Sequence, residues 1–281
     1  MQGTYGLPSS DEIYFLPGNP EEKDPALKKP PWKKFIRDLE QFKDYDGVAI
    51  VQMNPKYNAG GYELTAEKIL KKHLGVKCVR GYDLYQEINV QKRGATALLN
   101  ARLLPVMDKF FDATEKSLEE MGINLPLVIV KSDGSVMSKE YAKARPVETL
   151  LCGPAASVIG AMELAKANDA MIIDMGGTTS DIALMRDGKT VSALSGIRIG
   201  SWSTMVKGIA IDTFALGGDS GVKYQNGVMY LDERRMIPLC MLASNYPEVV
   251  PQLEALITRR QCYSYPAHEF FVLMNNPKDM S

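Results

Sequence analysis

The chain has 281 residues, of which 45% are hydrophobic and 24% are charged, so it is long enough to bury a core and too apolar for a disordered protein. Its 33 basic and 34 acidic side chains leave a net charge of −1, which argues against nucleic acid or an acidic membrane surface as a partner. No apolar run reaches the roughly 18 residues of a membrane span, and four widely spaced cysteines favour a reducing cytoplasm over a disulfide framework.

The first quarter of the chain predicts an arm followed by an α/β unit. Residues 1–30 are rich in proline, glycine and charge, which is typical of an arm or linker. Apolar spacing predicts a helix over 31–42. A short apolar strand over 47–53, a helix over 62–74 and a strand over 76–79 then have the order and spacing of a βαβ unit.

A long helical pattern covers about residues 88–121. Pro105 lies inside it and predicts a kink or a break into two helices. Gly122 is placed to end the helix in a left-handed conformation. The buried strand expected over 127–130 is followed by a polar turn at residues 131–134.

The second half of the chain predicts short strands with a few helices. They are expected over residues 154–165 (helix), 170–174, 181–186, 209–216, 222–224 and 228–231 (strands), 248–259 (helix) and 269–273 (strand). Asn226-Gly227 predicts a tight hairpin turn. Strands that alternate with helices predict an α/β protein, and we expect one lobe over 31–168 and a second over 169–281.

The most informative segment is Asp174-Met175-Gly176-Gly177-Thr178-Thr179-Ser180-Asp181, between two predicted strands. Glycines let backbone N–H groups approach an anion closely, and the two threonines add hydroxyl donors. The two carboxylates repel phosphate but suit Mg²⁺ or the orientation of a water molecule. The segment therefore predicts a phosphate-binding turn, although a hairpin with two incidental aspartates has the same pattern.

Other nucleotide and catalytic motifs are missing from the sequence. There is no Gly-Lys-Ser/Thr, and a strand rather than a helix follows the glycines, which excludes a Walker loop and a dinucleotide-binding fingerprint. The only two histidines, His73 and His268, have no partner at metal-ligand spacing. A histidine metal site and a Ser-His-Asp triad are therefore poor hypotheses.

Asp-x-Gly-Gly-Thr-x-x-Asp between strands resembles a phosphate loop of the actin-like ATPase superfamily. The order of the motifs over about residues 47–222 resembles the hydantoinase/oxoprolinase family. The segments that carry this resemblance are 92–101, 104–106, 131–134, 144–147, 152–156, 173–178, 211–213 and 216–221. The resemblance implies an actin-like, ribonuclease H-like α/β fold with a mixed sheet, flanking helices and two lobes.

The resemblance also implies ATP-dependent opening of a cyclic amide, such as hydantoin or 5-oxoproline, or a role as a subunit of an ATP-dependent carboxylase. A nucleotide-switched module that regulates or reactivates another enzyme is an alternative use of the same loop. The implied partners are ATP, Mg²⁺, a small cyclic amide, a second enzyme subunit and further copies of this chain. Neither nucleic acid nor a membrane is expected.

Site residues follow from the turn and from the resemblance. The residues expected to hold phosphate are Gly176, Gly177, Thr178 and Thr179. Gly217 and Gly218 belong to a second glycine-rich loop and are expected to line the nucleotide side. Asp174 is expected to position Mg²⁺, and Asp181 to assist the metal or the attacking water.

Three departures from the family pattern limit this expectation. No second Asp-x-Gly-Gly-Thr loop lies upstream, Asp219 stands inside the second loop, and residues from about 231 onward match no common family segment. We therefore expect a fragment or a shortened member. With one phosphate loop instead of two, the isolated chain is predicted to bind nucleotide weakly and to turn over little.

Three further segments each leave two interpretations open. Lys131-Ser132-Asp133-Gly134 either lines a substrate cleft or forms a polar turn. Arg145 either pairs with a phosphate or carboxylate of a ligand or makes a structural ion pair. Residues 54–61 either shape the cleft or form a plain loop.

Overall fold

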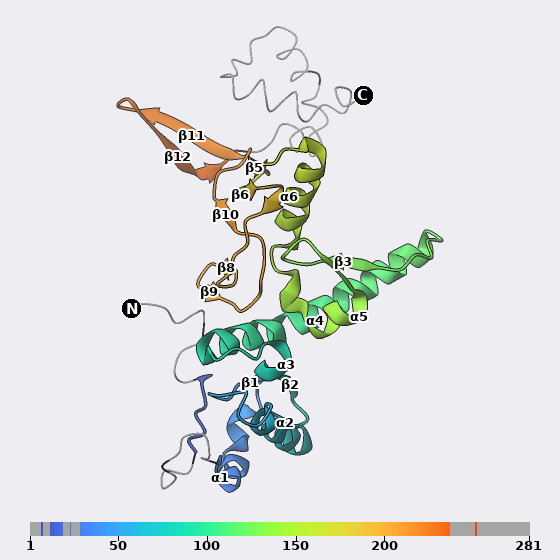
Figure 1. Ribbon diagram of the computed structural model, residues 1–281, viewed down its shortest axis with the longest axis vertical. Helices are drawn as coiled ribbons and strands as arrows, with labels where there is room; N and C mark the ends of the chain where they lie inside the picture. Colours follow the sequence, from blue (N-terminus) through green and yellow to red (C-terminus); the bar gives the residue numbers. More distant parts are fainter. Residues whose placement is uncertain (1–6, 8–11, 19–22, 24–28, 237–250, 252–281) are drawn as a thin grey trace. The chain divides into compact units, whose positions relative to one another are not determined.

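The computed structural model describes residues 7, 12–18, 23, 29–236 and 251. The chain divides into two compact units. Figure 1 labels the helices and strands along the chain. Unit 1 takes the chain up to Ala170 together with Ala183–Ile211, and unit 2 takes Met171–Ile182 together with the chain from Asp212. None of the helices within the described residues combines the length and the apolar character needed to span a bilayer.

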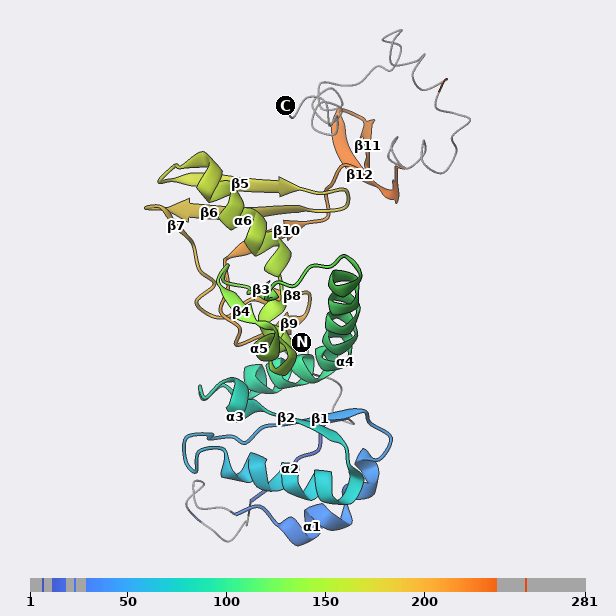
Figure 2. The same cartoon turned by 90° about the vertical axis from the view of Figure 1, so that its right-hand side faces the viewer.

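Unit 1 begins with the predicted βαβ arrangement. Strand β1 (Gly47–Ile50), helix α2 (Gly61–Leu74) and strand β2 (Lys77–Arg80) follow one another, and the two strands pair in parallel with Gly47 opposite Lys77. Helix α2 covers one face of this small sheet, and the first half of helix α4 (Val90–Glu120) covers the other (Figure 2). The βαβ prediction is confirmed.

The prediction of a single helix over 31–42 is wrong. Helix α1 (Trp32–Arg37) ends before the 3₁₀ turn η2 (Leu39–Phe42) begins. Asp38 separates them, and its carboxylate accepts hydrogen bonds from the Tyr14 hydroxyl at 2.7 Å and from Lys34 at 2.5 Å. Aspartate is a weak helix former whose side chain favours such local bonds. Helix α1 and turn η2 both pack on α2 through a cluster of buried apolar side chains: Phe35, Leu39, Ala66, Leu70 and Val76.

Helix α4 is continuous through Pro105, so the proline bends the helix without breaking it. In Figure 2 the first half (teal) and the second half (dark green) run in clearly different directions. Asn89 caps the start by accepting the Lys92 N–H at 3.0 Å. Gly122, with φ +68°, follows the last turn as predicted.

The remaining elements of unit 1 are short, apart from helix α6. They are α3 (Gly81–Leu84), β3 (Val128–Val130), β4 (Val136–Ser138), α5 (Lys139–Ala144), η3 (Pro146–Thr149), α6 (Cys152–Ala165), β7 (Lys189–Thr190), β8 (Arg198–Ile199) and β9 (Trp202–Ser203). The sequence did not predict β4, which pairs antiparallel with β3 around the polar turn 131–134. Helix α6 starts two residues before Pro154, which leaves the proline inside the first turn, where it needs no N–H partner.

Unit 2 is built from strands. They are β5 (Ala170–Met175), the start of β6 (Ser180–Arg186), β10 (Ile211–Phe214), β11 (Ser220–Gln225) and β12 (Val228–Arg235). One sheet has the order β10-β6-β5, with β7 pairing with β6, and β11 pairs antiparallel with β12. Asn226 and Gly227 both have positive φ between β11 and β12, which confirms the predicted hairpin turn.

Strand β10 is shorter than the strand expected over 209–216, because the chain after Phe214 enters the second glycine loop. The helix expected over 248–259 and the strand over 269–273 lie outside the described residues, except for Pro251. Helices pack on a parallel strand pair in unit 1 and strands dominate unit 2, so the predicted α/β class is confirmed.

Candidate functional site

The Gly-Gly-Thr segment forms a tight, exposed turn between neighbouring strands of unit 2. Strand β5 carries Asp174 toward it, and β6 carries Asp181 away. The N–H of Gly176 donates to the carbonyl of Thr179 at 2.8 Å, which closes the turn. Residues 176–178 are exposed. The turn is therefore accessible, as a phosphate-binding loop has to be.

The second glycine-rich loop is hydrogen-bonded directly to this turn. The N–H of Gly218 donates to the Gly176 carbonyl at 2.9 Å, and the N–H of Asp219 donates to the Gly177 carbonyl at 2.8 Å. Gly217 is buried between them, and a Cβ built there would lie 2.6 Å from the carbonyl carbon of Thr178. Only glycine fits at this contact, and the structure thus brings the two predicted loops together.

These contacts divide the predicted phosphate ligands into two groups. The N–H groups of Gly176, Gly217 and Gly218 are already engaged, the second with the Ser220 hydroxyl at 2.9 Å. They shape the turn. Gly177, in contrast, is exposed, and a Cβ added there would meet no atom within 4 Å. The open part of the turn is centred on Gly177.

The two carboxylates differ in how firmly they are held. A carboxylate oxygen of Asp181 accepts the hydroxyl of Thr213 on neighbouring strand β10 at 2.5 Å. Asp174 is half-buried near the end of β5. Among the described residues no group of three or more His, Cys, Asp or Glu side chains is placed to hold a metal ion. This donor set suits Mg²⁺ held mainly by phosphate oxygens and water.

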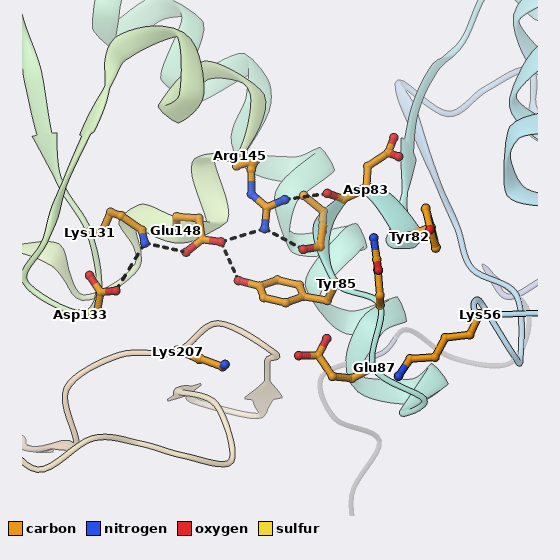
Figure 3. A pocket seen from close by; sticks show the side chains of 12 residues that line it. Lys56, Tyr82, Asp83, Tyr85, Glu87, Lys131, Asp133, Arg145, Glu148 and Lys207 are labelled. Atoms are coloured by element: carbon orange, nitrogen blue, oxygen red, sulfur yellow. Dashed lines mark hydrogen bonds and ion pairs between the residues drawn. The ribbon is translucent and has the colours of Figure 1, made fainter. Parts of the chain in front are cut away.

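A second candidate site is a polar pocket of about 660 Å³ in unit 1 (Figure 3). Lys131, Asp133 and Arg145, which the sequence singled out as possible cleft residues, all line it. Buried Ser132 fixes the wall between them, because its N–H donates to the Glu148 carbonyl at 2.9 Å and its carbonyl accepts the Ile209 N–H at 3.0 Å.

Arg145 and Glu148 form the centre of this pocket. They are 3.0 Å apart, and the Tyr85 hydroxyl donates to the same carboxylate oxygen at 2.7 Å. Arg145 also donates to the carbonyls of Asp83 at 2.6 Å and Leu84 at 2.7 Å. Burial and the neighbouring Glu148 carboxylate raise the pKa of Tyr85, so its hydroxyl stays protonated. Arg145 thus makes a structural ion pair and lines a pocket as well.

Sequence reasoning missed Tyr85, Glu148 and Lys207 as pocket residues. Glu148 follows Arg145 by three residues, which is a usable signal for an ion pair. Nothing in the sequence near Lys207 connects it with residues 131–134. Lys56 does line the pocket, so the loop over 54–61 contributes to it as one of the two open interpretations predicts.

A sequence model of the hydantoinase/oxoprolinase family matches residues 93–235, about half of the chain. A caprolactamase subunit alpha from Pseudomonas jessenii is 29% identical over 147 residues, which cover 50% of this chain and 20% of that protein. A 5-oxoprolinase from Saccharomyces cerevisiae is 27% identical over 236 residues, which cover 78% of this chain and 18% of that protein.

An uncharacterized protein of Methanocaldococcus jannaschii is 30% identical over 149 residues, covering 52% of this chain and 22% of that protein. The chain therefore spans about a fifth of the length of these curated relatives.

Two solved structures share the fold. The ATP-dependent caprolactamase from Pseudomonas jessenii has a TM-score of 0.59 at 20% identity, covering 79% of this chain and 32% of that chain. A nucleotide-free acetone carboxylase has a TM-score of 0.57 at 19% identity, covering 72% of this chain and 29% of that chain. Both support an α/β fold.

Proposed function

Because this chain belongs to the hydantoinase/oxoprolinase family, we propose that it serves the ATP-dependent opening of a cyclic amide of the hydantoin or 5-oxoproline type. The observation that carries this proposal is the exposed Gly176–Thr179 turn, which is hydrogen-bonded to the second glycine loop. The names of two relatives, a caprolactamase and a 5-oxoprolinase, agree with a cyclic amide as substrate. The actin-like, two-lobed arrangement with lobes over 31–168 and 169–281 belongs to the same proposal.

In this proposal ATP phosphorylates the amide oxygen and is released as ADP, which turns the amide carbon into an electrophile that water can attack. The attack leads to cleavage of the ring C–N bond, and hydrolysis then releases the phosphate. Gly177, Thr178 and Thr179 hold phosphate oxygens through backbone N–H and hydroxyl donors. Gly176 acts indirectly by shaping the turn, and Gly217 and Gly218 support it from the facing loop.

The two aspartates have separate roles. Asp174 positions Mg²⁺ through bound water, since Mg²⁺ keeps much of its hydration shell. Asp181 is held by Thr213 and orients the attacking water, because a fixed carboxylate is a better positioned acceptor than a free one. The low number of protein ligands for the metal means that binding of Mg²⁺ and of nucleotide depend on each other.

Partners are also part of the proposal. One relative is named as a subunit of its enzyme, and we expect a second subunit, or further copies of this chain, to be needed for turnover. The isolated chain is therefore expected to bind ATP weakly and to hydrolyse it slowly.

The test is titration calorimetry of the chain with ATP in the presence of Mg²⁺. Replacing both carboxylates (Asp174→Asn with Asp181→Asn) is expected to weaken binding about tenfold, because Mg²⁺ loses the Asp174 carboxylate that positions it through water and the site loses the negative charge of Asp181 nearby. The matched control is Asp212→Asn, an exposed carboxylate of the same unit, which should bind as the parent does. Equal affinity in the double variant and the parent contradicts the assignment.

ATP turnover separates the proposed hydrolase from a nucleotide-switched module. A hydrolase shows turnover that a small cyclic amide stimulates, whereas a switch shows slow turnover that the amide does not change. The same assay with the second subunit added tests the expected dependence on a partner.

A further inference from the structure

The pocket of unit 1 contains more positive charge than its own ion pairs neutralise. Arg145 and Glu148 neutralise each other at 3.0 Å. Lys131 is 3.4 Å from Asp133, and both line the pocket. Asp83 is paired at 2.6 Å with Arg80, which does not line the pocket. Arg80 is also paired with Glu67, and Glu67 with Lys71, so these four side chains outside and at the rim of the pocket neutralise one another.

Three charged side chains of the pocket wall take part in none of these ion pairs. They are Lys56, Lys207 and Glu87. All three are exposed, and neither lysine forms an ion pair with another described residue. Figure 3 shows that the lysines come from two different segments of the chain, with Glu87 directed into the cavity. The remaining charge is close to +1, which attracts a monoanion.

We propose that this pocket binds a small molecule that carries one carboxylate and an N–H donor. Lys56 and Lys207 supply the charge that attracts the carboxylate, and the carboxylate of Glu87 accepts the N–H group. A phosphate dianion fits less well, because carboxylates of the wall repel it and only one positive charge is in excess. That this ligand is the cyclic amide substrate rests on the proposed function, but its binding requires no nucleotide.

The floor of the pocket is preorganised for such a ligand. Glu148 is enclosed, with 7% of its side chain exposed, and both Arg145 and the Tyr85 hydroxyl bind it. The raised pKa of Tyr85 keeps this donor in place at neutral pH. The buried carboxylate is therefore compensated inside the protein, and it adds little repulsion to an incoming anion. A ligand need not reorder these groups to bind, which lowers the cost of binding.

The experiment uses the full chain without nucleotide and three probes that separate the features of the ligand. 5-Oxoproline has a carboxylate and an N–H, 2-pyrrolidinone has the same ring without the carboxylate, and inorganic phosphate is an anion without an N–H. We expect calorimetry or ligand-observed NMR to show binding of 5-oxoproline about tenfold tighter than binding of either other probe, which corresponds to one good charge-assisted contact.

Two variants and one control assign the site. Lys56→Gln and Lys207→Gln are each expected to weaken binding of 5-oxoproline about threefold to fivefold, the range of exposed charge contacts. Both side chains are exposed, so melting temperatures should match the parent. Lys68→Gln, an exposed lysine on α2 outside the pocket, should bind as the parent does.

Several outcomes would overturn the proposal. They are equal binding of 5-oxoproline and 2-pyrrolidinone, phosphate binding as tight as that of 5-oxoproline, unchanged affinity in both lysine variants, and no binding of 5-oxoproline. Failure of the proposed function has a different signature, which is unchanged ATP binding in the Asp174 and Asp181 double variant of unit 2. The two results are read from different probes and different residues.

Discussion

The two units differ in how deeply their key charged side chains are buried. In unit 1 the side chains of Glu63 and Arg93 are both fully buried, 3.5 Å apart. Glu63 accepts the N–H groups of Gln52 at 2.9 Å and Tyr82 at 2.7 Å, and Arg93 donates to the carbonyls of Gln52 and Glu87. In unit 2 Asp181 is only partly buried and lies beside an exposed turn.

This difference separates structural charges from charges available to a ligand. The polar atoms of Glu63 and Arg93 have their partners inside the protein, except the Arg93 Nε, which has no hydrogen-bond partner. Burial raises the pKa of Glu63 and lowers that of Arg93, so each depends on the other and on the backbone to stay charged. Asp174 and Asp181 of unit 2 are only partly buried, so neither of these side chains is enclosed by the protein as Glu63 and Arg93 are.

The largest expected effect comes from removing one member of the buried pair. Glu63→Ala leaves Arg93 as an uncompensated buried charge and two backbone N–H groups without an acceptor, which typically costs about 3–5 kcal/mol. Urea unfolding should show this loss. Glu119→Ala, an exposed carboxylate on α4, should stay within about 0.5 kcal/mol of the parent. If both variants were equally stable, the pair would not hold unit 1 together.

The contact between the loops of unit 2 should respond next. Gly217→Ala forces a methyl group against the carbonyl of Gly177, and overpacking of this kind costs about 1–3 kcal/mol. Gly177→Ala is the matched control in the facing loop, because its methyl group meets open space. Hydrogen exchange of the amides in β5 and β6 measures the difference. Equal protection in the two variants would show that the loops are not in close contact.

A pH series tests the core of unit 1 through Cys78 on β2. Burial raises the pKa of this thiol to about 11 from an ordinary value of 9.0. The unfolded chain therefore ionises first, and stability that is present below pH 9 is lost as pH rises toward 11. Between pH 8 and 10 the parent should lose at most about 1 kcal/mol more than Cys78→Ala, less than the full value of one pKa unit, because the thiol is only partly buried and solvent weakens the effect. Parallel pH profiles of the two proteins would contradict the burial of the thiol.

Short sequence patterns predicted the turns and the helix bend well, because these features depend on the residues at the position itself. Asn226-Gly227 predicted a turn because both positions need positive φ, and Pro105 predicted a bend because proline removes one helical hydrogen bond. Gly176 and Gly177 predicted the exposed turn for a different reason, because glycines without a Cβ let backbone N–H groups approach an anion, and neither residue has a positive φ. The break at Asp38 was missed, because the apolar spacing over 31–42 continues across this weak helix former.

The pocket of unit 1 shows what local patterns cannot predict. Lys131 and Arg145 stood out as polar residues beside turns, but their shared partner Glu148 and the distant Lys207 came from the folded structure. Gly208 passes so close to Ser132 that an added Cβ would lie 2.9 Å from the Ser132 carbonyl oxygen. That approach places Lys207 at the pocket, and no spacing in the sequence encodes it.

The smallest expected effect concerns how firmly Asp181 is held. Thr213→Val keeps the β-branched shape on β10 but removes the hydroxyl that donates to the carboxylate at 2.5 Å. The expected loss is about 0.5–1.5 kcal/mol of stability, and toward the lower end because Thr213 is exposed. Thr213→Ser restores the donor and should recover the parent value in thermal unfolding. ATP affinity in the presence of Mg²⁺ should fall in the valine variant and recover in the serine variant, because a carboxylate without its anchor is less well positioned. A valine variant that binds ATP like the parent would mean that Asp181 needs no anchor for its proposed role.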